Sequence, residues 1–292
     1  MTFERSFTRY LAAKQTVDDR ALNRRVWEAM CAALPPQTSS APLRVIEAGA
    51  GTGAMIERLI AQGVLRHAHY TAIDADQRNI CELQRQIPAW QGRAPDVTVD
   101  SESADIFEWI RREPARCACD VLMAHAMLDL LNLAHAVPQL LSLVKPGGLC
   151  YFTLNFDGAT IFEPAIDPML DAAIEQLYHQ TMDERLVGGE PSGDSRSGRH
   201  LFQLLQQHRV DLLAAGSSDW VVFADRDGYR NDEAYFLHFI VDTVRAALER
   251  HPQLALCRAE FLAWIERRHA QIDRGELIYI AHQLDFVGQR SV

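Results

Sequence analysis

Residues 43–55, with the sequence LRVIEAGAGTGAM, constrain the fold of this chain more than any other segment. A short apolar run leads into glycines at alternating positions, after which apolar residues resume at helical spacing. This pattern predicts a strand, a tight turn and a helix. Glycine adopts positive φ without a steric cost, and its bare backbone lets a ligand approach the main-chain N–H groups. Because the following helix directs its positive dipole end at the turn, the segment predicts a site for a nucleotide-type cofactor.

The glycine turn alone leaves two cofactors open. Gly49, Gly51 and Ala54 satisfy the dinucleotide pattern G-x-G-x-x-G/A. Glu47, followed by Gly49, Gly51 and Gly53, also resembles the acidic-x-G-x-G-x-G turn of S-adenosylmethionine-dependent methyltransferases. The choice between the two depends on the rest of the chain.

Composition and charge exclude several classes of protein. Hydrophobic residues make up 48% of the 292 residues, which is ample for a buried core, and no run of eighteen or more apolar residues occurs. The N-terminal residues lack the apolar core of a signal peptide, so we expect a cytoplasmic protein that does not enter a membrane. With 39 acidic against 29 basic residues, the net charge of −10 disfavours nucleic acid as a partner.

The six cysteines do not predict a metal site. Only Cys117 and Cys119 are close in sequence, and one C-x-C pair is poor spacing for zinc. We therefore expect reduced cysteines, most of them buried, and no bound metal.

Strands and helices alternate along the chain, which predicts a doubly wound, mostly parallel sheet of the α/β class. Residues 1–40 are expected to form an N-terminal helical arm, and residues 41–292 the main domain, with helices inserted around 230–272. After the opening strand, further strands are expected at residues 69–73, 96–99, 119–125, 149–154, 220–224 and 277–287. Further helices are expected at residues 80–87, 107–112, 137–143, 168–177, 201–210, 235–248 and 254–269.

Several motifs in this order together resemble the class I S-adenosylmethionine-dependent methyltransferases. They are the glycine turn, Asp74 after the second strand, Asp105 and Ile106 after the third, the strand 119–125, and Lys145-Pro146-Gly147-Gly148 before the fifth. A nicotinamide enzyme would have no reason to show Asp105 or the Pro-Gly-Gly turn. The resemblance covers about residues 43–155 and implies a seven-stranded Rossmann-like sheet with an antiparallel last strand. It also makes 220–224 and 277–287 candidates for an antiparallel pair at the sheet edge.

The resemblance implies roles for the residues around the glycine turn. The backbone from Glu47 to Gly53 would hold the methionine portion, Asp74 the ribose hydroxyls, and Asp105 the adenine amino group. Plainer roles stay open: Glu47 could cap the turn, Asp74 could be a surface-turn residue, and Asp105 could cap the following helix. The expected cofactor contacts are Glu47, Gly49, Ala50, Gly51, Gly53, Asp74, Ala75, Asp105, Ile106, His125, Tyr10 and Lys14.

Candidate catalytic bases lie where the strands end, because open α/β sheets bind ligands there. His125 ends the fourth strand and is our first candidate, and Asp157 follows the fifth. Further candidates are Asp129 after the fourth strand, Asn155 after the fifth, His282 within the final strand and Asp285 near its end. A histidine near neutral pKa suits proton removal, although a strand-end histidine can equally serve packing or cofactor contact. Positioning and desolvation can also accelerate methyl transfer without a base.

Two helical regions flank the expected site. Tyr10, Lys14 and Asp18 share one helix face at i, i+4 and i+8. That face is either solvated, or part of a lid whose Tyr10 and Lys14 reach the cofactor's carboxylate. Aromatic residues of the inserted helices either line an apolar acceptor pocket or pack in the core, and they include Phe236, Phe239, Phe261 and Trp264.

The expected function is S-adenosylmethionine-dependent methyl transfer to an oxygen or nitrogen atom of a small-molecule acceptor. The sequence Ala124-His125-Ala126-Met127 replaces the Asn/Asp-Pro-Pro-aromatic motif of enzymes that methylate nucleobase amino groups, which again disfavours nucleic acid. The alternatives are a nicotinamide-dependent oxidoreductase and a non-catalytic S-adenosylmethionine-binding protein. Assembly into a homodimer is left open.

Overall fold

One eight-stranded sheet forms the centre of the protein, whose computed structural model describes residues 6–113, 118–254 and 258–292. Seven strands follow the order β3-β2-β1-β4-β5-β10-β8, and β9 pairs with β10. Neighbours from β3 to β5 are parallel, whereas β10 is antiparallel to β5, β8 and β9. The prediction of a doubly wound, mostly parallel sheet with an antiparallel last strand is confirmed. The strands are β1 (Leu43–Ala48), β2 (Ala68–Asp74), β3 (Val97–Ser103), β4 (Cys119–His125), β5 (Val144–Glu163), β8 (Val210–Ser217), β9 (Trp220–Val222) and β10 (Ile278–Arg290).

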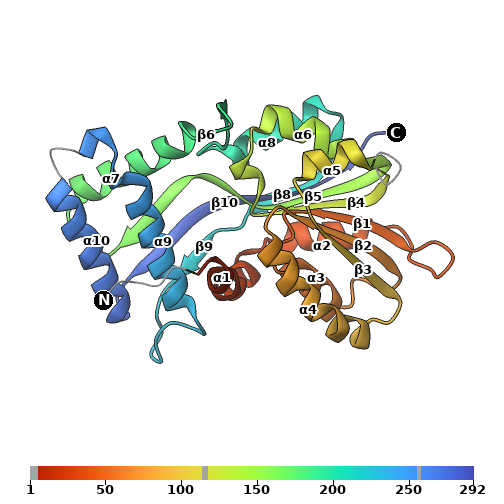
Figure 1. Ribbon diagram of the computed structural model, residues 1–292, viewed down its shortest axis with the longest axis horizontal. Helices are drawn as coiled ribbons and strands as arrows, with labels where there is room; N and C mark the ends of the chain where they lie inside the picture. Colours follow the sequence, from red (N-terminus) through yellow and green to blue (C-terminus); the bar gives the residue numbers. More distant parts are fainter. Residues whose placement is uncertain (1–5, 114–117, 255–257) are drawn as a thin grey trace.

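Helices cover both faces of this sheet, and each face has its own apolar core (Figure 1). Helices α2, α3 and α4 pack on one face, and α5, α6 and α8 pack on the other. The layered arrangement leaves the carboxyl ends of β1 to β4 as the edge where loops meet. The α-helices are α1 (Phe7–Ala21), α2 (Arg24–Ala33), α3 (Ala54–Ala61), α4 (Gln77–Arg93), α5 (Ile106–Arg112), α6 (Leu133–Leu141), α7 (Pro168–Asp183), α8 (Ser197–Gln207), α9 (Glu233–Leu248) and α10 (Arg258–Asp273). Two short 3-10 helices are η2 (Leu128–Leu130) and η3 (Pro252–Leu254). A small separate hairpin consists of β6 (Leu186–Val187) and β7 (Glu190–Pro191).

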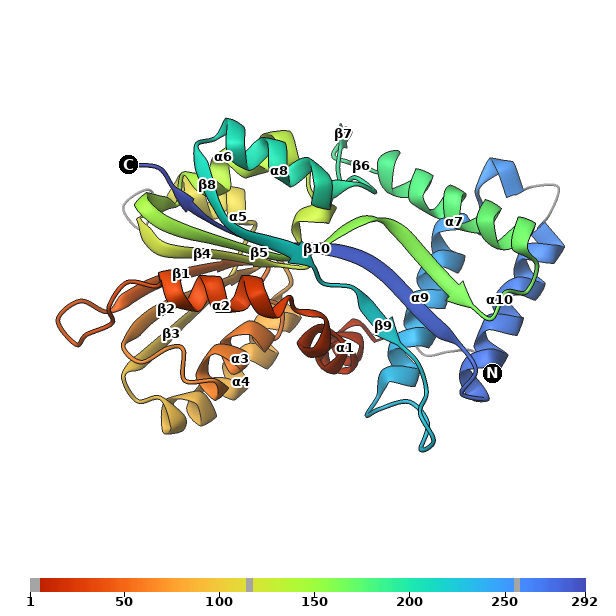
Figure 2. The same cartoon turned by 180° about the vertical axis from the view of Figure 1, so that it is seen from behind.

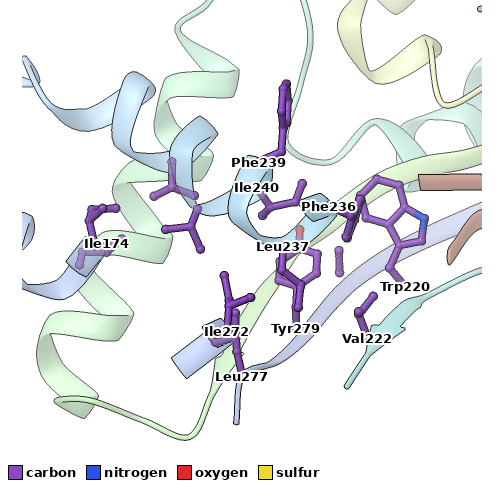
Figure 3. Close-up of a cluster of buried hydrophobic side chains, with 14 of the residues drawn as sticks. Ile174, Trp220, Val222, Phe236, Leu237, Phe239, Ile240, Ile272, Leu277 and Tyr279 are labelled. Carbon is purple, nitrogen blue, oxygen red and sulfur yellow. The ribbon is translucent and has the colours of Figure 1, made fainter. Parts of the chain in front are cut away.

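Strands β5 and β10 are longer than their neighbours and extend the sheet beyond the layered part. Their pairing runs from Leu149 with Gln289 to Glu163 with Ile278. Helices α7, α9 and α10 and strand β9 surround the outer halves of the two strands, as Figure 2 shows from behind. The apolar side chains there form a third core, in which Trp220 of β9, Phe236 of α9 and Tyr279 of β10 are buried (Figure 3). The chain therefore has a helical lobe built on an extension of its central sheet.

The edge strand beside β10 differs from the prediction. We expected residues 220–224 to form the sheet edge, but β8 (Val210–Ser217) occupies that place, and β9 pairs only with the outer half of β10. The expected helix 201–210 ends earlier, at Gln207, and Arg209 turns the chain with a φ of +56°. Leu212 and Leu213 are 37% and 43% exposed, so β8 lacks the alternating buried pattern that identifies a strand.

Helix α1 lies between the layered part and the helical lobe in both views (Figures 1 and 2). Asp19 of α1 accepts a 2.7 Å hydrogen bond from Nε of Arg58 in α3. On the other side, Arg20 donates to Glu233 of α9 at 3.0 Å. The main-chain N–H of Asn23, just after α1, donates to the buried Asp285 of β10 at 2.8 Å. Polar contacts thus attach this helix to both parts of the protein.

Candidate functional site

The glycine turn lies between β1 and α3, where its three glycines adopt positive φ. Gly49, Gly51 and Gly53 have φ values of +70°, +53° and +90°. At Gly53 space is also limiting, because a Cβ atom there would lie 2.4 Å from the Trp90 ring. The main-chain N–H groups of Gly49 and Ala50 donate to the carbonyl of Ile73 at 2.8 and 3.0 Å, which ties the turn to the end of β2.

Asp74, the last residue of β2, joins the glycine turn to the start of α4. One carboxylate oxygen accepts the N–H of Gly51 at 2.8 Å. The other accepts from the N–H of Asp76 at 2.9 Å and from the Asn79 amide at 3.1 Å. The Asp74 side chain is half-buried and the neighbouring Ala75 is exposed. Asp74 therefore supports the glycine turn and is also accessible to a ligand bound next to the turn.

Asp105 follows β3 and caps α5. Its Oδ1 accepts the N–H groups of Phe107 and Glu108 at 2.9 and 3.0 Å. Asp105 therefore caps the helix, and the capping bonds use one carboxylate oxygen of this exposed residue. Ile106, next in the chain, is 5% exposed. The two roles considered for Asp105 are thus compatible.

Glu47 is a buried residue of β1, two residues before the first glycine of the turn. It is 1% exposed, and the Tyr70 hydroxyl donates to its Oε2 at 2.8 Å. Burial raises the pKa of Glu47 to about 8, although the hydrogen bond from Tyr70 and the charge of Arg58 act in the opposite direction. With this pKa the carboxyl group is protonated at neutral pH, where it is hydrogen-bonded to Tyr70 of β2.

The polar face of α1 is buried against the end of β4, so the solvated alternative for this face is wrong. Lys14 and Asp18 are 6% and 3% exposed and form an ion pair with each other. Asp18 also accepts from Nε1 of Trp220 at 2.9 Å and lies 3.3 Å from Nε2 of His125. Burial alone would raise the pKa of Asp18, but Lys14 and His125 outweigh it and lower this pKa to about 2. Asp18 is therefore a charged centre that holds α1 on the site.

Both ring nitrogens of His125 are engaged. Nδ1 lies 2.6 Å from the Thr153 hydroxyl, and Nε2 faces Asp18. Burial lowers the pKa of His125 to about 4 against the opposing influence of Asp18, so the ring is neutral at pH 7. Because the Asp18 carboxylate only accepts hydrogen bonds, we assign the proton to Nε2, with Nδ1 accepting from Thr153. The assignment of His125 as a base stays a prediction, and its observed contacts are those of a residue that positions α1.

Asp157 of β5 is buried at a different place in the protein. Its carboxylate accepts from the main-chain N–H and the Nε of Arg199 at 3.0 and 2.8 Å, and it lies 3.7 Å from His282. These partners belong to α8 and β10. Among the described contacts, none connects Asp157 with the glycine turn or with His125. Its catalytic role stays a prediction.

The segment after β4 approaches the glycine turn directly. Met127 packs on Gly49, where a Cβ atom would lie 2.9 Å from the Met127 side chain. Two residues later, on η2, the Oδ1 atom of Asp129 is buried without a hydrogen-bond partner. Burial raises the pKa of Asp129 to about 6. Asp129 was one of several strand-end candidates in the sequence, and only the structure distinguishes it from the others.

Leu11 and Tyr10 of α1 face the same region from the other side. The Leu11 side chain is the nearest neighbour of Gly51, 3.7 Å from where a Cβ atom would lie. The Tyr10 ring stacks on Phe239 and Phe236 of α9, with centroids 4.2 and 5.7 Å apart. Helix α1 therefore covers the glycine turn and connects it with the aromatic side chains of the helical lobe.

The described residues give no support for a metal site or a membrane span. No group of three or more His, Cys, Asp or Glu side chains in residues 6–113, 118–254 and 258–292 could hold a metal ion. Cys119 is buried and reduced, while its neighbour Cys117 lies outside the described residues. None of the helices that the structure describes combines the length and apolar character needed to cross a bilayer.

Known proteins that match this chain are found among the solved structures. No model of a protein family matches the sequence, and neither does any curated protein. A protein from Anaeromyxobacter dehalogenans with the provisional designation of type II methyltransferase is 15% identical, with 92% of this chain and 97% of that one covered and a TM-score of 0.50. The YcgJ protein from Bacillus subtilis is 12% identical, with 92% and 100% covered and a TM-score of 0.48. Geranyl diphosphate C-methyltransferase from Streptomyces coelicolor A3(2), in complex with Mg²⁺, geranyl diphosphate and S-adenosyl-L-homocysteine, is 10% identical, with 91% and 76% covered and a TM-score of 0.47. The likeness to the first shows that this chain has the class I methyltransferase fold.

Proposed function

We propose that this protein transfers a methyl group from S-adenosylmethionine to a small-molecule acceptor. The observation that carries the proposal is the hydrogen bond between the glycine turn and Asp74, in which the Gly51 N–H donates to the carboxylate at 2.8 Å. It sets an acidic side chain and a turn of positive-φ glycines side by side at the carboxyl ends of two neighbouring strands. Open α/β sheets bind nucleotide-type ligands at this kind of edge.

The residues present fit the cofactor. The backbone from Glu47 to Gly53 would hold the methionine portion, Asp74 the ribose, and Asp105 the adenine amino group through the oxygen that does not cap α5. S-adenosylmethionine supplies an electrophilic methyl group when bound. The protein contributes position and exclusion of water, because α1 covers the turn through Leu11.

We infer that the arm formed by residues 1–40 and the helices around residues 230–272 act together as a cover for the acceptor. Arg9 of α1 pairs with Asp232 at the start of α9 at 2.7 Å, and Tyr10 stacks on Phe239. Lys14 pairs with Asp18 within α1, and we expect its ammonium group to reach the cofactor's carboxylate. The acceptor atom is an oxygen or a nitrogen, and a cytoplasmic location without a nucleic-acid partner stays a prediction.

Replacing Asp74 by alanine tests the cofactor site. We expect the affinity for S-adenosylhomocysteine, measured by calorimetry, to fall about 10- to 100-fold, because the hydrogen bonds that the ribose hydroxyls donate to the carboxylate are lost. Asp96→Asn is the matched control, since Asp96 is 65% exposed in the loop before β3 and should leave the affinity unchanged. An Asp74→Ala protein that binds S-adenosylhomocysteine as tightly as the wild type would contradict the assignment.

A further inference from the structure

The sheet extension formed by β9 and the outer halves of β5 and β10 has its core on one face. On that face Trp220, Val222 and Tyr279 are 8%, 0% and 4% exposed. Figure 1 shows α9 in front of these strands, and Figure 2, from the opposite side, shows the strands in front of α9. Because successive side chains of a strand point to opposite faces, the residues between the buried ones point away from the helical lobe.

The outward face of the extension is apolar, and we define this apolar sheet face as Ile161, Val221, Phe223, Ile278 and Ile280. Strand pairing places Ile161, Ile280 and Val221 in one row across β5, β10 and β9. Ile161 and Val221 are 38% and 44% exposed, and Ile280 between them is half-buried. Ile278 and Phe223, two residues along β10 and beyond β9, are 39% and 51% exposed. Apolar side chains from three neighbouring strands thus form one exposed patch.

Charged residues border the apolar sheet face, and they have partners within the chain. Asp219, just before β9, lies 2.8 Å from Nδ1 of His282. Before β10, Arg274 and Glu276 form an ion pair at 2.7 Å. The Glu163 carboxylate, at the end of β5, accepts a main-chain N–H at 2.8 Å. An apolar centre with a polar rim is the anatomy of a protein interface, and this rim does not require a partner of opposite charge.

The charge of the chain disfavours lipid and nucleic acid as occupants of this face. A net charge of −10 repels anionic headgroups and phosphates, and Arg274 in the rim is already held by Glu276. A flat sheet face packs well on another sheet face about 10 Å away, with the strands aligned within about 30°. The same face of a second copy has the required shape and apolar character. A two-fold axis at the central strand β10 sets the outer strands of each copy against those of the other.

We infer that the apolar sheet face is the interface of a homodimer, with Ile280 of β10 near the two-fold axis. The two extensions would form a sandwich in which each sheet supplies its outward face, while the helical lobes stay on the two outer sides. The inference goes beyond the proposed function and does not depend on it, because the face points away from the helical lobe that covers the proposed site.

The dimer would also brace the helix that covers the glycine turn. Strand β9 is three residues long, and it carries Val221 on the apolar sheet face and Trp220 on the buried face. Trp220 donates from Nε1 to Asp18 of α1 at 2.9 Å. A partner that packs on Val221 therefore restrains the strand that binds α1. Amide hydrogens of residues 220–222 should exchange more slowly at protein concentrations where the dimer forms.

Sedimentation equilibrium of the full chain tests this inference. We expect the wild type to reach twice the chain mass of 32.9 kDa, with a dissociation constant in the micromolar range or below. Val221→Lys should raise that dissociation constant at least about 30-fold, because each copy would bury an ammonium group without a counterion. Val187→Lys is the matched control, since Val187 is 64% exposed on the separate hairpin and should leave the dimer unchanged.

Both lysine variants replace exposed side chains, so their circular dichroism spectra should equal that of the wild type. A wild type that stays monomeric at about 100 μM, well above the dissociation constant of a standard interface, would overturn the inference. So would a Val221→Lys protein that remains dimeric, or equal weakening by the two lysines. A monomeric wild type that co-sediments with phosphatidylserine vesicles would assign the face to a membrane instead. A dimer that fails to bind S-adenosylhomocysteine would support this inference while contradicting the proposed function.

Discussion

Replacing Asp18 by alanine should lower the free energy of unfolding by about 3–5 kcal/mol, the usual cost of breaking a buried ion pair by removing one partner. The substitution leaves Lys14, which is 6% exposed, without its counterion. It also removes the hydrogen-bond acceptor of the buried Trp220 N–H and the partner of His125. Since these contacts hold α1 to β4 and β9, amide hydrogens of residues 7–21 should exchange faster in the variant.

Urea unfolding of a matched pair of variants measures this effect. Asp232→Ala removes an exposed ion pair that also joins α1 to α9, with Arg9 and Asp232 side chains 56% and 45% exposed, and should cost no more than about 1 kcal/mol. Acid titration gives a second readout. The folded pKa of Asp18, about 2, lies below its ordinary value of 3.8, so its stabilising contribution is present above about pH 4 and is lost as the pH falls towards 2. A difference between wild type and Asp18→Ala below 1 kcal/mol, or one that does not shrink in acid, would contradict this account.

Replacing Gly53 by alanine should lower the free energy of unfolding by about 2–4 kcal/mol. About 1 kcal/mol comes from the left-handed backbone, since Gly53 has a φ of +90°. A further ~1–3 kcal/mol comes from overpacking, because the new Cβ atom would lie 2.4 Å from the Trp90 ring. Trp90 is 1% exposed and bound to Glu57 through its N–H at 2.7 Å, so the ring cannot simply move away.

Gly63 provides the control for Gly53. It has a φ of +65°, and a Cβ atom there would meet nothing within 4 Å. Gly63→Ala should therefore cost only the backbone part, about 1 kcal/mol, and should leave the affinity for S-adenosylhomocysteine unchanged. Chemical denaturation of both variants separates the two contributions. Equal costs at the two positions would show that the Trp90 contact does not constrain the turn.

The part of the site that the sequence predicts is the part made of local patterns. A strand, three alternating glycines and the start of a helix within thirteen residues define the turn, and the acids at the ends of the next two strands lie at the same edge of the sheet. Parallel pairing of β1 with β2 and of β2 with β3 brings these strand ends together, whatever the rest of the chain does. Periodicity and turn residues therefore suffice to predict this region.

The contacts that complete the site could not be predicted in this way, because they join residues far apart in sequence. His125 lies 107 residues from Asp18, and Trp220 lies 202 residues from it. Their meeting depends on where β9 and α1 pack on the extended β5–β10 pair, and no local pattern encodes that. Strand β8 was missed for a related reason, since its side chains are exposed and only pairing with β10 defines it. The surroundings of Asp157 could not be predicted either, because its partner Arg199 belongs to the distant helix α8.

Calorimetric titration of the wild-type protein with S-adenosylhomocysteine, in parallel with NADH, tests the central claim most directly. We expect S-adenosylhomocysteine to bind at one site per chain with a dissociation constant in the micromolar range, about −8 kcal/mol, and NADH to give no binding heat. A glycine turn tied to Asp74, with Asp105 at the next strand end, accounts for that preference. Binding of NADH, or the absence of any binding of S-adenosylhomocysteine, would contradict it.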